Sequence, residues 1–218
     1  MTLVANTTPV NAIASLSDLI DEIRDELDDA EFSETKILRA IARAEALFNR
    51  RLRTPYMETQ ASVASSTENV ALPTDFLELR RIYNDDAVDC PLIATSPEAL
   101  RRLYGGTGGV PTHYAIEGRR ILVAPVGEVT VNFLYYAKIP ALNSENPTNW
   151  LLEQHPDLYL HMALSILFNK LGDNERGALN YGLSEGFISE INIAASQARW
   201  GGAPIRPSHI RQVRGARI

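Results

Sequence analysis

We expect a mainly α-helical protein: a helical bundle that carries a small antiparallel β-rich insertion lobe and ends in an extended C-terminal tail. Three observations predict this class. Apolar residues recur every three or four positions near both ends of the 218-residue chain, which is the period of an amphipathic helix. The middle of the chain has short, partly alternating segments between turn residues, as strands do. The last residues are rich in glycine, proline and arginine and cannot form a core alone.

The N-terminal part, residues 1–56, is expected to supply two helices of the bundle. Ser15 or Ser17 can cap the first helix, in which acidic residues follow at once and favour the positive end of the helix dipole. The second helix starts at Ser33 and stops before Pro55, since proline cannot continue a helix. The two apolar stripes consist of Leu16, Leu19, Ile20, Ile23 and Leu27, and of Ile37, Leu38, Ile41, Ala44, Phe48 and Leu52.

Residues 57–140 are expected to form the β-rich lobe, a small antiparallel sheet interrupted by one short helix. Ser96 can cap that helix, with proline at its first position and an acid after it. The glycine run at 105–109 leads into a strand rather than into a Gly-Lys-Ser/Thr sequence, so it reads as a connector and not as a phosphate loop. The strand segments expected are 69–72, 76–83, 87–93, 113–116, 120–124 and 129–137.

Residues 141–200 are expected to form a helix hairpin that completes the bundle. Apolar residues cover nearly every face from Asp157 to Leu171, which predicts a helix buried on all sides. A polar break at Gly172–Asn174 then separates this helix from an amphipathic one. The expected stripe of the second helix is Leu179, Leu183, Phe187, Ile191, Ala194 and Ala198. Residues 201–218 follow as an extended basic tail.

The two ends of the chain carry opposite charges. The segment from Asp18 to Glu31 has eight acids and one base, whereas Arg199 to Ile218 has five arginines and no acid. The net charge of −6 argues against a general nucleic-acid binder, which is usually basic overall. We therefore expect the ends to contact different surfaces. We also expect no membrane span, no secretory signal and, from the single cysteine, a reducing cytoplasm as the place of synthesis.

No catalytic or metal-binding pattern stands out, and we expect no enzymatic activity and no cofactor. The four histidines, His113, His155, His161 and His209, match neither HExxH nor zinc spacing, so bland structural roles are favoured. Cys90 has no activating neighbour in the sequence, and its apolar surroundings favour a packing role. A small cysteine hydrolase remains an alternative, because the fold can bring a histidine close to a cysteine.

Several stretches resemble the tailed-bacteriophage head-to-tail adaptor (connector) proteins. They span about residues 30–200, and it is their order and spacing that carry the resemblance. The stretches are Leu72-Pro-Thr-Asp-Phe-Leu-Glu-Leu79, Tyr114-Ala-Ile-Glu-Gly-Arg-Arg-Ile-Leu-Val-Ala-Pro125, Phe133-Leu-Tyr-Tyr136, Asn149-Trp-Leu-Leu152, His155-Pro-Asp-Leu-Tyr-Leu160 and Asp173-Asn-Glu-Arg176.

The resemblance implies a structural virion protein that forms a homo-oligomeric ring, commonly of twelve copies. Such a ring lies below the portal, extends the DNA channel and offers a platform to a tail or nozzle protein. DNA passes through without sequence-specific binding. The protein is then expected in the host cytoplasm during assembly and afterwards at the head-tail junction of the virion.

The resemblance also gives expected roles to both charged ends. In the family the C-terminal extension reaches the portal, which implies portal contacts for the basic tail, and its arginines with interspersed apolar residues suit an acidic, grooved partner. An acidic helix that faces the channel repels DNA and lets it slide. The tail candidates are Trp200, Arg206, His209, Ile210, Arg211, Val213, Arg214, Arg217 and Ile218. The channel candidates are Asp18, Asp21, Glu22, Asp25 and Asp28. The alternative for the tail is a nucleic-acid-binding module, which predicts DNA binding with a steep salt dependence.

Overall fold

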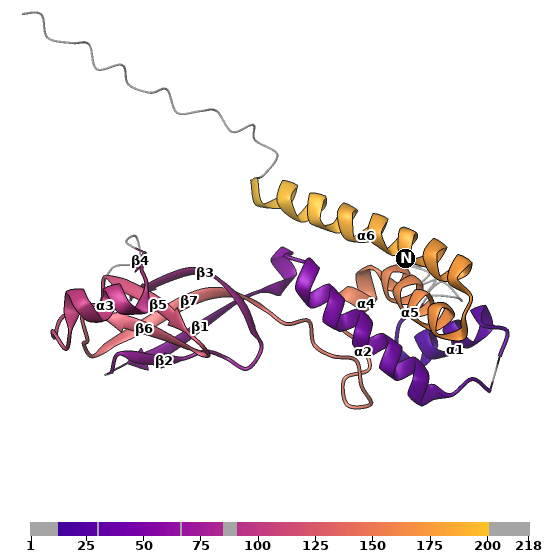
Figure 1. Ribbon diagram of the computed structural model, residues 1–218, viewed down its shortest axis with the longest axis horizontal. Helices are drawn as coiled ribbons and strands as arrows, with labels where there is room; N and C mark the ends of the chain where they lie inside the picture. The colour runs from indigo at the N-terminus through magenta and orange to yellow at the C-terminus, as the bar shows by residue number, and fades with distance from the viewer. Residues whose placement is uncertain (1–12, 30, 66, 85–90, 201–218) are drawn as a thin grey trace, which may run out of the picture.

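The computed structural model describes residues 13–29, 31–65, 67–84 and 91–200, and shows a helical half and a β half arranged end to end (Figure 1). About 49% of the structure is helical and 23% is strand. The helices are α1 (Leu16–Glu26), α2 (Glu34–Arg51), the single 3-10 turn η1 (Pro55–Met57), α3 (Pro97–Tyr104), α4 (Trp150–Gln154), α5 (Pro156–Leu171) and α6 (Asn174–Trp200). The strands are β1 (Glu58–Ser65), β2 (Asn69–Ala71), β3 (Phe76–Asn84), β4 (Ile93–Ala94), β5 (His113–Glu117), β6 (Arg120–Ala124) and β7 (Val129–Ala137).

Helix α5 is the centre of the helical half, with α1, α2, α4 and α6 packed around it. Its side chains are apolar on nearly every face, so it can be stable only where neighbours cover all of it. The structure confirms that expectation. Tyr159 is fully buried and meets Phe48 of α2 edge to face, with ring centroids 5.2 Å apart. Fully burying one such side chain contributes about 1.5–3 kcal/mol, and α5 buries many: Leu158, Tyr159, Leu160, Met162, Ala163, Leu164, Leu167 and Phe168.

The ends of the helices follow local chemistry that the sequence predicts. Ser15 caps α1: its hydroxyl accepts the backbone N–H of Asp18, and the Asp18 carboxylate accepts the backbone N–H of Ser15. Ser33 takes the cap position of α2, but its side chain makes no capping bond. Gly172 ends α5 at φ +90°, a left-handed conformation that glycine adopts without strain.

A buried polar network fastens the loop between β7 and α4 to two helices. The Glu45 side chain of α2 is buried, and its Oε1 accepts the backbone N–H of Leu142 at 2.8 Å and the hydroxyl of Tyr159 at 3.4 Å. Asn149 Nδ2 donates to the Tyr159 hydroxyl at 2.9 Å and to the Pro140 carbonyl at 2.7 Å. Burial raises the pKa of the Glu45 carboxyl, because water no longer stabilises its charge. The network fixes the path by which the chain re-enters the helical half.

The β half consists of two sheets that share one apolar core. One sheet has the strand order β1-β7-β3, and the other has β2-β6-β5-β4. Ile121 and Val123 of β6 point into the core formed with β3 and β7, whereas Leu122 and Ala124 face the opposite side. There Leu100 of α3 covers them, which explains why β6 is buried on both faces.

The expected fold class is therefore wrong in one respect: this is not a mainly α bundle with a small β lobe. The middle of the chain builds two sheets of 3 and 4 strands. The two sheets share one apolar core, and a second, smaller core lies between β5, β6 and α3. Strand β1 was not expected, because its residues are short and mostly polar, yet it pairs along its whole length with β7. The sheets are also not wholly antiparallel, since β4 runs parallel to β5. Part of the expected strand 87–93 lies outside the described residues.

The amphipathic stripe expected on the last helix is also displaced. Toward α5 the helix α6 buries Asn180, Ser184 and Ile188, together with Ile191 and Ala195. Leu179 and Leu183, which the periodicity assigned to the core, are 64% and 44% exposed. The buried face of α6 thus combines the polar Asn180 and Ser184 with two isoleucines and an alanine, whereas the large side chains of Leu179 and Leu183 lie on the exposed side.

Candidate interaction surfaces

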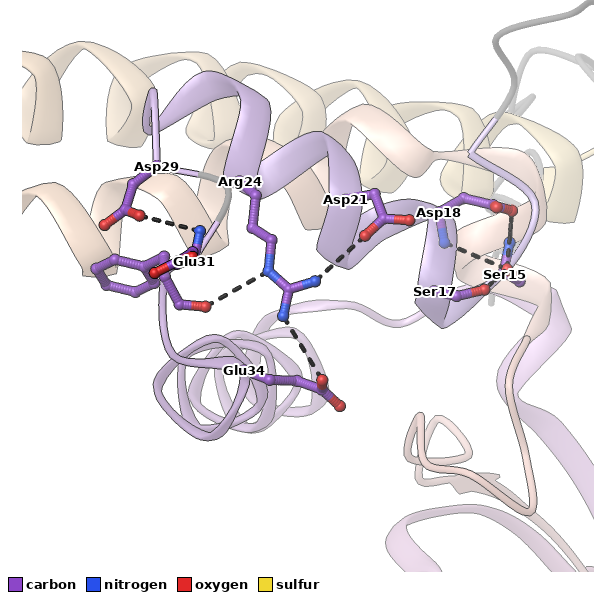
Figure 2. A network of polar contacts seen from close by, with 9 residues as sticks. Ser15, Ser17, Asp18, Asp21, Arg24, Asp29, Glu31 and Glu34 are labelled. Atoms are coloured by element: carbon purple, nitrogen blue, oxygen red, sulfur yellow. Dashed lines mark hydrogen bonds and ion pairs between the residues drawn. The ribbon is translucent and has the colours of Figure 1, made fainter.

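The acidic face of α1 is partly neutralised inside the subunit. Figure 2 shows Arg24 reaching from α1 between two carboxylates: it lies 3.3 Å from Asp21 and 3.6 Å from Glu34 of α2. The Asp18 carboxylate is held by the cap, since it accepts the backbone N–H of Ser15 at 2.9 Å and the Ser15 hydroxyl at 2.8 Å. The hydroxyl bond lowers the pKa of Asp18. Two of the five channel candidates thus have structural roles within the helical half.

The other three channel candidates face outward with less internal support. Asp25 and Asp28 are exposed and Glu22 is half-buried. Asp28 follows the end of α1 with φ +56°, a turn conformation that aspartate tolerates better than most residues. Within the described residues no ion pair forms at these three carboxylates. Like the exposed Glu26, they are carboxylates on or just after α1 that form no ion pair with a described cation.

The outer face of α2 carries basic residues and small side chains, a feature that we did not predict from the sequence. Side chains three, four or seven positions apart lie on one side of a helix. On α2 this side holds Ala42 and Ala46 among four exposed cations, and Lys170 of α5 stands beside it across a hollow of about 360 Å³. Among the described residues no carboxylate pairs with these cations. They are Lys36, Arg39, Arg43 and Arg50.

The outer side of α6 carries large apolar residues that nothing in the described part of the chain covers. Leu179 and Leu183 lie on it, with Tyr181 and Ile193 nearby, and all four are exposed. Monomeric proteins tolerate scattered exposed leucines, but apolar residues in register along one helix mark a contact surface. Leu179 and Leu183 belong to the apolar stripe predicted for this helix, which we expected either this chain or a neighbouring chain to cover. The described part of this chain leaves both of them exposed.

An apolar groove of about 510 Å³ continues this surface toward the end of α6. Its walls include Tyr56 of η1 and Trp150 of α4, whose rings stack with centroids 5.3 Å apart. Thr54 lies at its base and is 2% exposed, and its Oγ1 has no hydrogen-bond partner among the described residues. The side of the groove that α6 supplies consists of Phe187, Glu190, Ile191, Ala194, Ala195 and Ala198.

The junction between the helical and β halves holds the start of the basic tail. Arg199 donates to the Arg53 carbonyl at 2.6 Å and lies 3.5 Å from Glu58 of β1. Its guanidinium faces the ring of Tyr136, which also receives the guanidiniums of Arg53 and Arg80 at 5.7 Å and 5.5 Å. The guanidiniums of Arg53, Arg80 and Arg199 thus surround one buried ring, and we call this cluster the Arg199 clamp.

The tail candidates themselves are not tested by the structure. Trp200 is the last residue of α6, and its side chain is not described. The remaining eight candidates, from Arg206 to Ile218, lie outside the described residues, as does Cys90.

The described histidines make ordinary structural contacts. His161 Nδ1 lies 2.8 Å from Asn180 Oδ1, and His113 Nδ1 lies 2.8 Å from the Tyr104 hydroxyl. His155 stands at the start of α5, where burial lowers its pKa. In the parts of the chain that the structure describes, no group of three His, Cys, Asp or Glu side chains is placed to hold a metal ion. Over the same residues, no helix has the length and apolar character needed to cross a membrane.

Comparison with known proteins assigns the chain. A family model described as SU10 adaptor protein matches residues 14–208. The match includes every helix and strand that the structure describes, and it confirms the resemblance to phage head-to-tail adaptors. No curated protein matches the chain.

Proposed function

The chain belongs to the SU10 adaptor protein family of phage head-to-tail adaptors, and from this premise we propose that it forms a ring between the portal and the tail. Members of the family are structural components of the virion that interact with other head and tail proteins. The finer steps are our proposal: a homo-oligomer of twelve copies, a portal above it, a tail or nozzle protein below it, and DNA in its central channel.

The family match is the observation that carries this proposal, and the surfaces of the helical half support it. The apolar outer side of α6 needs a protein partner, because burying it against another subunit removes it from water. Acidic residues gather on α1 and basic residues gather on the outer face of α2. On the surface of an ordinary monomer, charges of both signs are interspersed. Unlike faces on one subunit permit head-to-tail contacts, which close into rings.

We propose that the helical and β parts have separate tasks. Residues 1–56 and 141–200 build the wall of the ring, and residues 57–140 project from it toward a neighbour in the virion. Residues 201–218 reach the portal. The Arg199 clamp supports this division, because it fixes the point from which the tail departs.

Deletion of residues 201–218 tests the role of the tail. Full-length protein is expected to bind isolated portal rings in a pull-down, and the truncated protein is expected to lose that binding while its helical content by circular dichroism is unchanged. If truncation leaves portal binding intact but removes affinity for double-stranded DNA with a steep salt dependence, the nucleic-acid-binding alternative replaces the portal role.

The acidic face of α1 is proposed to line the channel. Asp25→Lys combined with Asp28→Lys reverses two carboxylates that make no internal ion pair in the described structure. We expect phage carrying both changes to assemble but to eject DNA more slowly in a receptor-triggered ejection assay, because a cation in the channel attracts phosphates. Glu98→Lys combined with Glu128→Lys, which reverses two exposed acids of the β half, is the matched control. Unchanged ejection by the α1 double variant would contradict this orientation of α1.

A further inference from the structure

One side of α6 forms a continuous strip that its own subunit leaves largely uncovered, apart from Phe187, which is half-buried and stacks on the ring of His161. We call the α6 strip the six residues spaced three or four apart along this side, so that they share one face. Its first half is open: Leu179 and Leu183 are 64% and 44% exposed. Its second half, from Phe187 onward, is a wall of the apolar groove. The strip consists of Leu179, Leu183, Gly186, Phe187, Glu190 and Ala194.

Two glycines make this side of α6 unusually thin. A Cβ built on Gly186, or on the neighbouring Gly182, meets no atom within 4 Å. Glycine inside a helix costs about 1 kcal/mol relative to alanine, and nothing within the subunit requires these two. Small residues on a helix face allow the backbone of another helix to approach closely. The two glycines therefore indicate a helix that packs here and belongs to another molecule.

The groove supplies an independent sign of a missing partner. Tyr56 is 63% exposed on one wall of the groove, and its ring stacks on Trp150 with centroids 5.3 Å apart. An aromatic side chain of this size gains by burial against another chain. A partner chain that enters the groove covers both rings.

The face that best complements the α6 strip lies on the other side of the same molecule. The outer face of α2 combines the small residues Ala42 and Ala46 with four cations that form no ion pair with a described carboxylate. The charges of α6 beside the strip are Glu175, Glu190 and Arg176; Arg176 is already paired with Asp173 at 2.9 Å, so the two glutamates remain without an ion pair in the described residues. Helices α2 and α6 lie on opposite sides of α5 (Figure 1). The end of α2 that meets its own α6 contacts Glu185 and Asn192, which are outside the strip.

We propose that the α6 strip of one copy packs against the outer face of α2 in the next copy. This inference rests on the proposed ring and assigns the contact that builds it. Opposite charges at the rim favour this pairing over α6 against α6, which brings Glu190 near a second Glu190 or another acidic side chain. Because the two faces differ and lie on opposite sides of α5, each copy uses one on each neighbour, and the chain of contacts can close.

Cross-linking between two single-cysteine chains tests the pairing. In a Cys90→Ser background, one chain carries Leu183→Cys in the α6 strip and the other carries Ala46→Cys on α2, both at exposed positions. We expect a short bismaleimide to give heterodimers from the mixture and far fewer dimers from either chain alone. A chain with both cysteines is expected to give a ladder of higher oligomers. Ser196→Cys, which is exposed on α6 and is not three, four or seven positions from any member of the strip, is the matched control and is expected to cross-link poorly with Ala46→Cys.

The outcomes separate this inference from the proposed function. Dimers of the Leu183→Cys chain with itself, or equal cross-linking by Ser196→Cys, overturn the pairing of α6 with α2 but leave a ring possible through other faces. If wild-type protein forms no ring on the portal, the proposed function fails, and the pairing fails with it. Gly186→Leu gives a second measurement. Because a side chain there meets nothing in the subunit, the variant is expected to fold normally. We expect it to need at least a tenfold higher protein concentration to assemble. Normal assembly by that variant would refute close packing at the strip.

Discussion

The buried carboxylate of Glu45 gives the sharpest test of how the helical half is held together. Glu45→Ala removes the acceptor for the Leu142 N–H and the Tyr159 hydroxyl and leaves both in a buried site. Each unsatisfied group costs about 1–3 kcal/mol, and the longer Tyr159 bond contributes at the low end. We therefore expect a loss of about 2–4 kcal/mol in the free energy of unfolding. Glu45→Gln keeps an acceptor oxygen and is expected to lose about 1 kcal/mol or less near neutral pH.

The pH dependence gives the same prediction an internal control. Because burial raises the pKa of Glu45 in the folded protein, the folded state binds this proton more tightly than the unfolded chain does. Its stabilising contribution is thus fully present below the unfolded pKa, about 4.3, and is lost as the pH rises through the higher folded value. Glu45→Gln cannot ionise and lacks this loss. The wild type should therefore fall in stability relative to Glu45→Gln as the pH increases above about 4.

Urea unfolding followed by circular dichroism, at several pH values between about 4 and 8, measures all three proteins. The expected order at neutral pH is wild type and Glu45→Gln close together, with Glu45→Ala well below. Equal stability of Glu45→Ala and wild type would refute the network. A constant difference between wild type and Glu45→Gln across this range would refute the raised pKa.

Four further substitutions test other local features, the first three by thermal and urea unfolding and the last by limited proteolysis. Gly186→Ala should stabilise the subunit by about 0.5–1 kcal/mol, because the added Cβ meets no other atom. Gly172→Ala should destabilise the subunit by about 1 kcal/mol, because φ is +90° at that position. Equal effects of the two substitutions would contradict this reasoning. Ser15→Ala breaks the capping box of α1 and should cost about 0.5–2 kcal/mol, and no loss would show that the cap is dispensable. Tyr136→Leu keeps an apolar side chain but removes the ring that three guanidiniums face, so limited proteolysis should cut at the junction faster than in wild type, and unchanged cleavage would argue against the clamp.

Helix positions were predictable from the sequence because their signals are local. The serine before α1 and the glycine after α5 act on neighbouring backbone groups. The all-round apolar character of α5 likewise needs no knowledge of its partners to predict burial. For the same reason, the family could be identified from short stretches along the chain.

The extent of the β half was not predictable, because strand pairing is not local. The residues of β1 are polar or small, and they form a strand because β7 offers a full antiparallel register. Strand β6 is buried on both faces only because α3 returns over the second face. The sequence therefore indicated a β-rich lobe but underestimated two sheets with their own cores.

The surfaces that matter for function were only partly predictable. The spacing of apolar residues grouped Leu179 and Leu183 on one stripe of the helix. That spacing alone cannot show whether the stripe packs within the same subunit or against another one. Regular spacing of cations along α2 was visible in the sequence, and a helix projection of the charged residues, rather than of the apolar ones, would have found it. The internal contacts of Asp18 and Asp21 are the Ser15 cap and the Arg24 ion pair (Figure 2), and only the structure shows both.

Mass analysis of the purified full-length protein, alone and mixed with its portal ring, tests the central claim most directly. We predict a closed ring, formed either by the protein alone or on the portal, with a mass that corresponds to twelve copies. A ring of another copy number would revise the stoichiometry and keep the adaptor role. Protein that stays monomeric at high concentration and ignores the portal would contradict the proposed ring.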